Sequence, residues 1–210
     1  MNLILSQYVR LLKERGQFDV LMPDLLMAMR IIPITKPGTG TRQFGVDLPA
    51  VGIDPDDGNK KLFLFVLKCG DIGRGEWENG DQAVRPSLNE ILDIYLKNHI
   101  SPEHANLPRK IVLSTSGDIK EAVKHNWEGF SHSNSARAEF SFWGADKVAI
   151  LMEKYMLNEH IFSDDDRTNL RRSLALAGEI DYSHHDLHKL LASQLKLNGN
   201  RPAAPPMNSN

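Results

Sequence analysis

The spacing of hydrophobic residues changes several times along the chain, and each change predicts a different element. Apolar residues recur at helical spacing over residues 5–12, and Gly16 ends that run. A second short helix is expected from Pro23 to Met29, because proline is favoured at the first helical position. The N-terminal segment is therefore predicted to be helical.

Two β-rich runs follow, and the polar segment between them predicts a β-hairpin. The runs cover residues 44–54 and 61–68, and the intervening segment contains the turn pair Asp57-Gly58. The second run holds six consecutive apolar residues, Leu62–Leu67, and ends in Lys68. Such an uninterrupted apolar run is typical of a strand that is buried on both faces.

The remaining pattern predicts an alternation of helices and strands. Residues 71–83 are polar and rich in glycine, so we expect a loop there. A helix with one apolar face should follow from Pro86 to Asn98. The later elements are expected in this order: a buried strand over 109–118, a helix from Asp118 to Glu128, a strand over 136–144, and helices over 145–156, 164–177 and 184–196.

This order of elements predicts an α/β fold, with a mixed β-sheet flanked by helices on both faces. We expect the α/β domain to cover residues 1–157 and a small helical C-terminal appendage to cover 158–197. Residues 198–210 are rich in proline and asparagine, which favours a disordered tail or linker.

Composition narrows the class of protein only a little. The chain has 25 Lys+Arg and 27 Asp+Glu, so its formal net charge is −2, which argues against a generally basic protein but permits a local basic patch. Cys69 is the one cysteine, so no disulfide can form within the chain, as suits a reducing compartment. No apolar stretch reaches transmembrane length, and we expect a cytoplasmic protein without a membrane partner.

The chemistry-bearing residues of the hairpin are Asp47 and Lys68. Folding the two runs back about a turn near Asp57 places Asp47 opposite residues 66–68, and neighbouring strands lie about 5 Å apart. An acid and a lysine at the end of a buried strand must pair with each other or bind something else, since burying either charge alone is costly. A partly buried ion pair that closes the sheet edge and a functional site both satisfy this requirement.

The same residues carry a resemblance to a known family. Gly45-Val46-Asp47, followed by an apolar strand that ends in Val66-Leu67-Lys68, resembles the PD-(D/E)XK nuclease superfamily, which has the restriction-endonuclease-like fold. The expected order of elements over residues 1–157 also resembles nuclease domains of bacterial restriction and anti-phage defence proteins.

The resemblance implies a metal-dependent DNA endonuclease. Asp47 and the backbone carbonyl of Leu67 would ligate Mg²⁺ or Mn²⁺, and Lys68 would orient the attacking water and help to deprotonate it. A hard cation with oxygen ligands stabilises the negative charge that builds on a phosphodiester under attack. The implied partner is DNA, and the protein would act as a homodimer or within a larger defence assembly.

The sequence departs from the family pattern at Val66, where the second acid of the motif would stand. Asp71, Glu14 and Asp24 are candidates to supply the missing carboxylate. The alternative is a catalytically degenerate nuclease-fold module that binds nucleic acid or a partner protein. A small α/β interaction protein, in which the Asp47 and Lys68 side chains form a structural pair, is a third possibility.

Candidate nucleic-acid contacts follow the motif lysine. Arg74, Gln82 and Arg85 are expected to contact phosphates or to face the site, although an exposed loop position explains Gln82 equally well. Trp77 has two interpretations: it stacks on a base or sugar, or it attaches the loop to the hydrophobic core.

Overall fold

The computed structural model describes residues 2–34, 44–80, 82–156, 163–176 and 183–199. Contacts divide the chain into two compact units, Met1–Leu157 and Asn158–Asn210. Most of the expected C-terminal tail, residues 200–210, lies outside the described residues.

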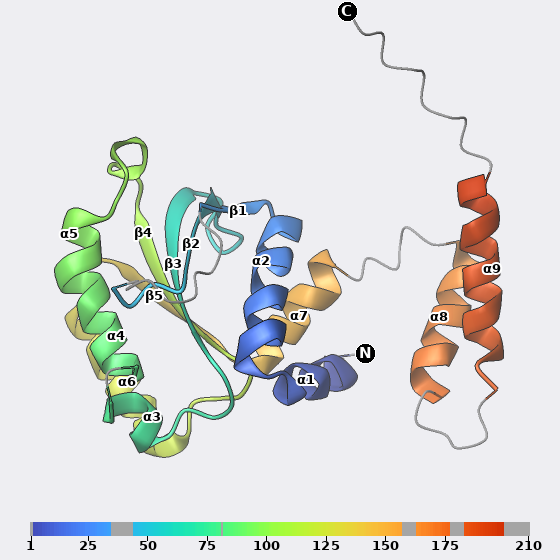
Figure 1. The fold of residues 1–210 in the computed structure, drawn as a ribbon, viewed down its shortest axis with the longest axis horizontal. Coiled ribbons are helices and arrows are strands. Elements are labelled where there is room, and N and C mark those ends of the chain that lie inside the picture. Colours follow the sequence, from blue (N-terminus) through green and yellow to red (C-terminus); the bar gives the residue numbers. More distant parts are fainter. Residues whose placement is uncertain (1, 35–43, 81, 157–162, 177–182, 200–210) are drawn as a thin grey trace, which may run out of the picture. The chain divides into compact units, whose positions relative to one another are not determined.

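The first unit is built on a five-stranded mixed sheet with strand order β1-β2-β3-β4-β5 (Figure 1). The strands are β1 (Ile31–Pro33), β2 (Leu48–Ile53), β3 (Lys60–Lys68), β4 (Arg109–Thr115) and β5 (Glu139–Trp143). β1, β2 and β3 pair antiparallel, whereas β3, β4 and β5 pair parallel. The predicted α/β class with a mixed sheet is confirmed.

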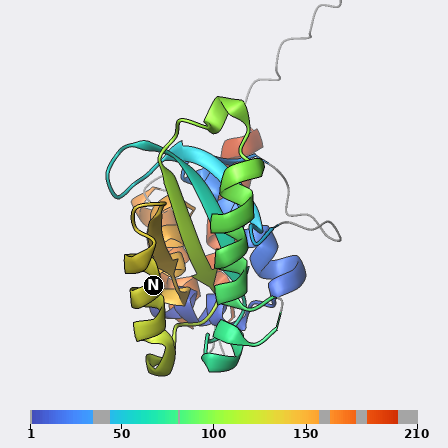
Figure 2. The same cartoon turned by 90° about the vertical axis from the view of Figure 1, so that its left-hand side faces the viewer.

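Helices cover both faces of this sheet (Figures 1 and 2). One face carries α1 (Asn2–Leu11), a π-helical turn (Glu14–Phe18), α2 (Asp19–Ala28) and α7 (Ala145–Tyr155). The other face carries α3 (Arg74–Glu78), α4 (Val84–Glu90), a π-helical turn (Ile91–Tyr95), α5 (Leu96–Asn98) and α6 (Glu121–Ser133), and a 3₁₀ turn (Pro102–His104) precedes β4.

β3 separates the two hydrophobic cores of the unit. Its side chains alternate in direction, as the period of a strand requires. Phe63, Phe65 and Leu67 enter the core beneath α1, α2 and α7. The intervening residues Leu62, Leu64 and Val66 enter the core beneath α3, α4 and α6. The prediction of a strand buried on both faces is confirmed.

The predicted β2–β3 hairpin is also present. Leu48 pairs with Phe65 and Ile53 with Lys60, so the register centres on the turn at Asp56 and Asp57. Within the turn, the Asp54 amide donates to the carbonyl of Asn59 at 2.8 Å.

The expectation for the second helix is wrong at its start. α2 begins at Asp19, and Pro23 lies inside the helix rather than at its first position. Burial explains the earlier start, because an apolar stripe at helical spacing outweighs the cost of one proline. The buried residues of this stripe are Phe18, Met22, Leu25 and Leu26.

The glycine-rich segment 71–83 is not only a loop, because it contains the short helix α3. Trp77 of that helix is 2% exposed and packs edge-to-face on Phe130, with ring centroids 6.2 Å apart. Trp77 therefore attaches the segment to the core, and the stacking interpretation is wrong.

The predicted start of α6 is also wrong. α6 begins at Glu121 rather than Asp118, because Ile119 still pairs with Ile72 beyond the end of β4.

The second unit is a helical hairpin of α8 (Asp164–Leu176) and α9 (His185–Gly199). The buried carboxylate of Asp166 accepts a hydrogen bond of 2.8 Å from Ser193, and Leu190 is buried. The two expected helices are present, although α9 extends past the predicted end at residue 196. Within the described part of the chain, every helix is too short or too polar to span a bilayer.

Candidate functional site

Asp47 lies directly before β2 and extends the hairpin by one pair. Its amide donates to the carbonyl of Phe65 at 2.9 Å, so Asp47 stands opposite Val66. Its carboxylate oxygen Oδ2 accepts a hydrogen bond of 2.7 Å from the amide of Leu67. The half-buried carboxylate of Asp47 is thus held at the carboxyl end of β3.

A close backbone contact positions the segment that carries Asp47. Gly45 has a φ of +80°, and a Cβ at this position would lie 2.1 Å from the carbonyl oxygen of Ser87 in α4. Only glycine fits both the left-handed conformation and this approach. The neighbouring Val46 is buried in the core beneath α4, which fixes the entry of the chain into β2.

Lys68 is the last residue of β3, and its side chain is partly exposed. Because side chains alternate along a strand, Lys68 emerges on the same face as Val66 and Asp47. Its ammonium Nζ donates to the backbone carbonyl of Gln82 at 2.7 Å, just before α4. Asp47 and Lys68 therefore emerge at the same end and on the same face of the sheet.

The oxygen donors here fit a hard cation incompletely. The amide and carbonyl of one residue in an antiparallel strand face the same neighbour. Since the Leu67 amide faces Asp47, the Leu67 carbonyl faces the same side. A carboxylate and a carbonyl suit Mg²⁺, which keeps several waters when protein ligands are few. Val66 is fully buried and offers no side-chain oxygen, so of the described motif positions Asp47 alone supplies a carboxylate.

The three candidate replacement acids lie in different parts of the chain. Asp71 accepts a hydrogen bond of 3.1 Å from the amide of Asp118, and its carboxylate lies 3.9 Å from the guanidinium of Arg10. Asp24 is exposed on α2, which packs on the opposite face of the sheet from Lys68. The side chain of Glu14 lies outside the described part of the structure.

A pocket of about 400 Å³ opens beside Lys68 and contains a carboxylate that the sequence did not indicate. Glu76 of α3 lines this pocket, and its Oε2 accepts a hydrogen bond of 3.0 Å from the amide of Gly73. Hydrogen bonds from the backbone amides of Glu76 itself and of Gly73 lower the pKa of this carboxyl. The spacing Gly73-x-x-Glu76 is that of a capping box, the one signal that sequence reasoning missed.

The three residues expected to contact nucleic acid differ in their surroundings. Gln82 is exposed and lines the pocket, and its backbone carbonyl accepts the hydrogen bond from Lys68. Arg74 is exposed at the start of α3. Arg85 forms an ion pair with Glu78. Their roles in binding nucleic acid stay predictions.

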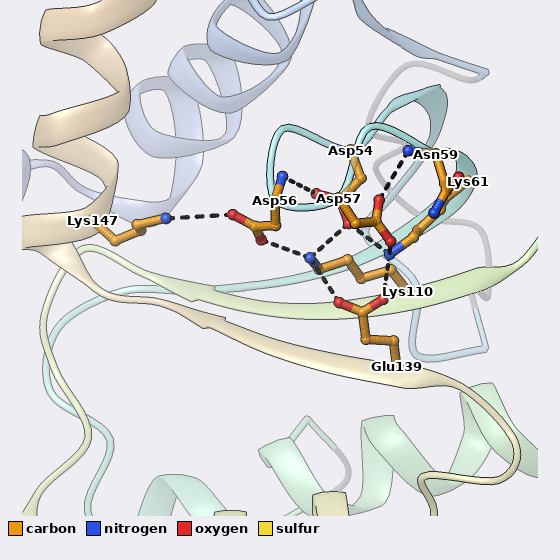
Figure 3. Close-up of polar contacts among 8 residues, drawn as sticks. All are labelled: Asp54, Asp56, Asp57, Asn59, Lys61, Lys110, Glu139 and Lys147. Carbon is orange, nitrogen blue, oxygen red and sulfur yellow. Dashed lines mark hydrogen bonds and ion pairs between the residues drawn. The ribbon is translucent and has the colours of Figure 1, made fainter.

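A second group of charges lies at the opposite end of the parallel strands, on the other face of the sheet (Figure 3). Lys61 at the start of β3 and Lys110 at the start of β4 both donate to Oδ2 of Asp54, each at 2.8 Å. The side chains of these three residues are 5%, 1% and 1% exposed, respectively. We call them, with the acids around them, the ion network.

More exposed acids complete the ion network. Lys110 lies 2.8 Å from Asp56 and 2.9 Å from Glu139, and Lys61 lies 2.7 Å from Asp57 and also pairs with Glu139. Burial alone would lower the pKa of both lysines, but the carboxylate hydrogen bonds outweigh burial and raise it. The hydrogen bond from Lys61 lowers the pKa of Asp57 to about 2.

Carboxylate oxygens of Asp54, Asp57 and Glu139 lie within 4.8 Å of one another, a spacing that one cation can bridge. The ammonium groups of Lys61 and Lys110 already lie among these oxygens. A divalent ion would have to displace two buried positive charges, so the ion network does not fit a metal. It connects the hairpin turn to β4 and β5.

Comparisons with known proteins add one distant similarity. No protein-family model and no curated protein matches the sequence. Among solved structures, the chain is similar to the MspJI restriction endonuclease in complex with a 27-mer oligonucleotide, with a TM-score of 0.38 and 12% identity. The match covers 74% of this chain and 31% of that chain. A similarity of this size assigns no family.

Proposed function

We propose that this chain is a metal-dependent endonuclease that hydrolyses DNA phosphodiester bonds, with Asp47, Leu67 and Lys68 as its reacting site. The geometry at the open end of the β2–β3 hairpin supports the proposal. The Asp47 amide bonds to Phe65 and the Asp47 carboxylate to the Leu67 amide, which places an acid and Lys68 on one face. This arrangement agrees with the PD-(D/E)XK motif that the sequence resembles.

Each residue has a distinct part in the proposed reaction. The Asp47 carboxylate and the Leu67 carbonyl would hold Mg²⁺ or Mn²⁺, which stabilises negative charge on the phosphate and acidifies a bound water. Lys68 would orient the attacking water and stabilise the developing charge. An ammonium has three donors, so Lys68 can remain on the Gln82 carbonyl and still donate toward the reacting phosphate.

The wider setting of this proposal rests on the resemblance. A role in anti-phage defence, a homodimer or larger defence assembly, and a cytoplasmic location are all predictions of that kind. Arg74 and Arg85 near the pocket are the proposed phosphate contacts, with Gln82 facing the site.

A plasmid-nicking assay with Mg²⁺ or Mn²⁺ tests the proposal. The parent should nick supercoiled DNA, and Asp47→Asn or Lys68→Met should each lower the rate by about 100-fold or more. Matched controls are Asp24→Asn and Lys60→Met, which change exposed residues far from the site and should leave the rate unchanged. A parent that never nicks DNA with either metal would refute the proposal.

The burial of Val66 favours a second candidate, a degenerate nuclease fold that binds DNA without cutting it. Its signature is DNA affinity that neither requires a divalent metal nor changes with Asp47→Asn. Under the hydrolase proposal, that substitution should weaken DNA binding specifically in the presence of a non-cleaving divalent ion such as Ca²⁺. Filter binding with Ca²⁺ and with chelator separates the two candidates.

A further inference from the structure

The pocket beside Lys68 is a built feature that the proposed reaction does not use. Its volume of about 400 Å³ lies in the range of pockets that hold small organic ligands. Ile72 and Ala83 give it an apolar part, and both are buried. Asn79 and Glu76 give it polar groups.

The charges of the pocket do not favour a second phosphate. Among the described lining residues, Lys68 contributes one positive charge and Glu76 one negative charge, so these charges balance. A carboxylate repels phosphate, whereas a neutral planar ring with hydrogen-bonding edges suits a balanced pocket with apolar walls. A nucleobase has these properties.

We propose that this pocket binds a nucleobase that presents an exocyclic amino group beside a ring nitrogen, namely adenine, cytosine or guanine rather than thymine. The proposal rests on the proposed function in taking nucleic acid as the ligand, and it deepens that function by naming a base preference. The base would belong to a single strand or be extruded from a duplex next to the reacting phosphate.

Two side chains, one from α3 and one from its C-terminal cap, supply the recognition. Glu76 lies within α3, Asn79 caps the helix in an extended conformation, and both line the pocket. The Glu76 carboxylate accepts from the exocyclic amino group, and the Asn79 amide, which has both a donor and an acceptor, pairs with the adjacent ring nitrogen. Thymine has no amino group and would place a carbonyl oxygen against the carboxylate.

The helix cap leaves Glu76 able to take this part. Its Oε2 accepts from the Gly73 amide, but a carboxylate has two oxygens and accepts several hydrogen bonds. The Glu76 carboxyl is ionised at neutral pH, and the hydrogen bonds from the backbone amides lower its pKa further. The cap also fixes the side chain, so little conformational freedom is lost when a base binds.

Nuclear magnetic resonance titration without metal tests the proposal. The probes are deoxyadenosine, deoxycytidine, thymidine and inorganic phosphate, and the readouts are the amide signals of Asn79 and Gln82. Deoxyadenosine and deoxycytidine should bind at least tenfold more tightly than thymidine. Glu76→Gln should remove most of this preference, because glutamine keeps the cap but loses the charge. The control Glu78→Gln, on the same helix and outside the pocket lining, should not.

Three results would overturn the proposal: equal affinity for thymidine, shifts caused by phosphate alone, or no shift with any probe. Thermal melting of Glu76→Gln checks that the variant is folded. A protein that nicks DNA but ignores nucleosides would refute the base pocket alone. A protein that binds the two nucleosides but never nicks DNA would refute hydrolysis and leave the pocket in place.

Discussion

The two ends of β3 hold charged side chains in opposite ways. At its amino end, Lys61 and the neighbouring Lys110 are buried among carboxylates from the hairpin turn and β5. At its carboxyl end, roughly 23 Å away along the strand, Lys68 bonds to a backbone carbonyl and Asp47 accepts a backbone amide. The charges of Lys61 and Lys110 are compensated by carboxylates, whereas the ammonium of Lys68 is held by a neutral carbonyl and has donors left for a ligand.

The largest expected effect is on stability, at the amino end. Lys110→Met should lower the free energy of unfolding by roughly 3–5 kcal/mol, because it leaves the buried carboxylate of Asp54 with one ammonium fewer. Urea denaturation measures the change. The control Lys147→Met removes an exposed partner 3.9 Å from Asp56 and should cost at most about 1 kcal/mol. Equal losses for the two variants would contradict the distinction between the ends.

The carboxyl end should respond in the opposite way. Lys68→Met and Asp47→Asn should each reduce DNA nicking by about 100-fold or more. Both should change the free energy of unfolding by less than about 1 kcal/mol, since Lys68 is partly exposed and asparagine can still accept from Leu67. Nicking and urea denaturation on the same samples check this. A loss of stability like that of Lys110→Met would mean that the pair is structural.

A pair of glycine substitutions tests how the Asp47 segment is positioned. Gly45→Ala should cost about 2 kcal/mol or more, because the methyl group would overlap the Ser87 carbonyl at a positive φ. Gly58→Ala has a similar φ of +75° with open space around the added carbon, so it should cost only about 1 kcal/mol. Thermal or urea unfolding compares them. Only Gly45→Ala should also slow nicking, and equal behaviour of both variants would discount the contact with α4.

The smallest expected effect is the acid response of the ion network. The folded pKa of Asp57, about 2, lies below its unfolded value of about 3.9. The stabilisation is therefore complete above pH 4 and is lost as the pH falls toward 2. Asp57→Asn should flatten stability against pH in this window, measured by urea midpoints. An unchanged slope would indicate that Asp57 does not pair with Lys61 in solution.

Local patterns predicted the central strands well, and for clear reasons. The apolar run Leu62–Leu67 has no polar position on either face, so it required a strand covered on both sides. The hairpin turn predicted Asp47 opposite residues 66–68, and the observed register puts it opposite Val66. Prediction failed at α3 and at the start of α2, where burial of Trp77 and Met22 against distant residues outweighed glycine and proline signals.

The sequence by itself determined the α/β class, the hairpin and the end of the sheet at which Asp47 and Lys68 emerge, because these follow from periodicity and turn position within about 25 residues. The hairpin loop is longer than two residues, so the structure alone fixed the exact register. Only the tertiary structure decided which acids meet Lys61 and Lys110, and that Glu76 lines a pocket with Lys68. These contacts join separate strands and helices. Their formation depends on how elements pack across the sheet, which no local spacing encodes.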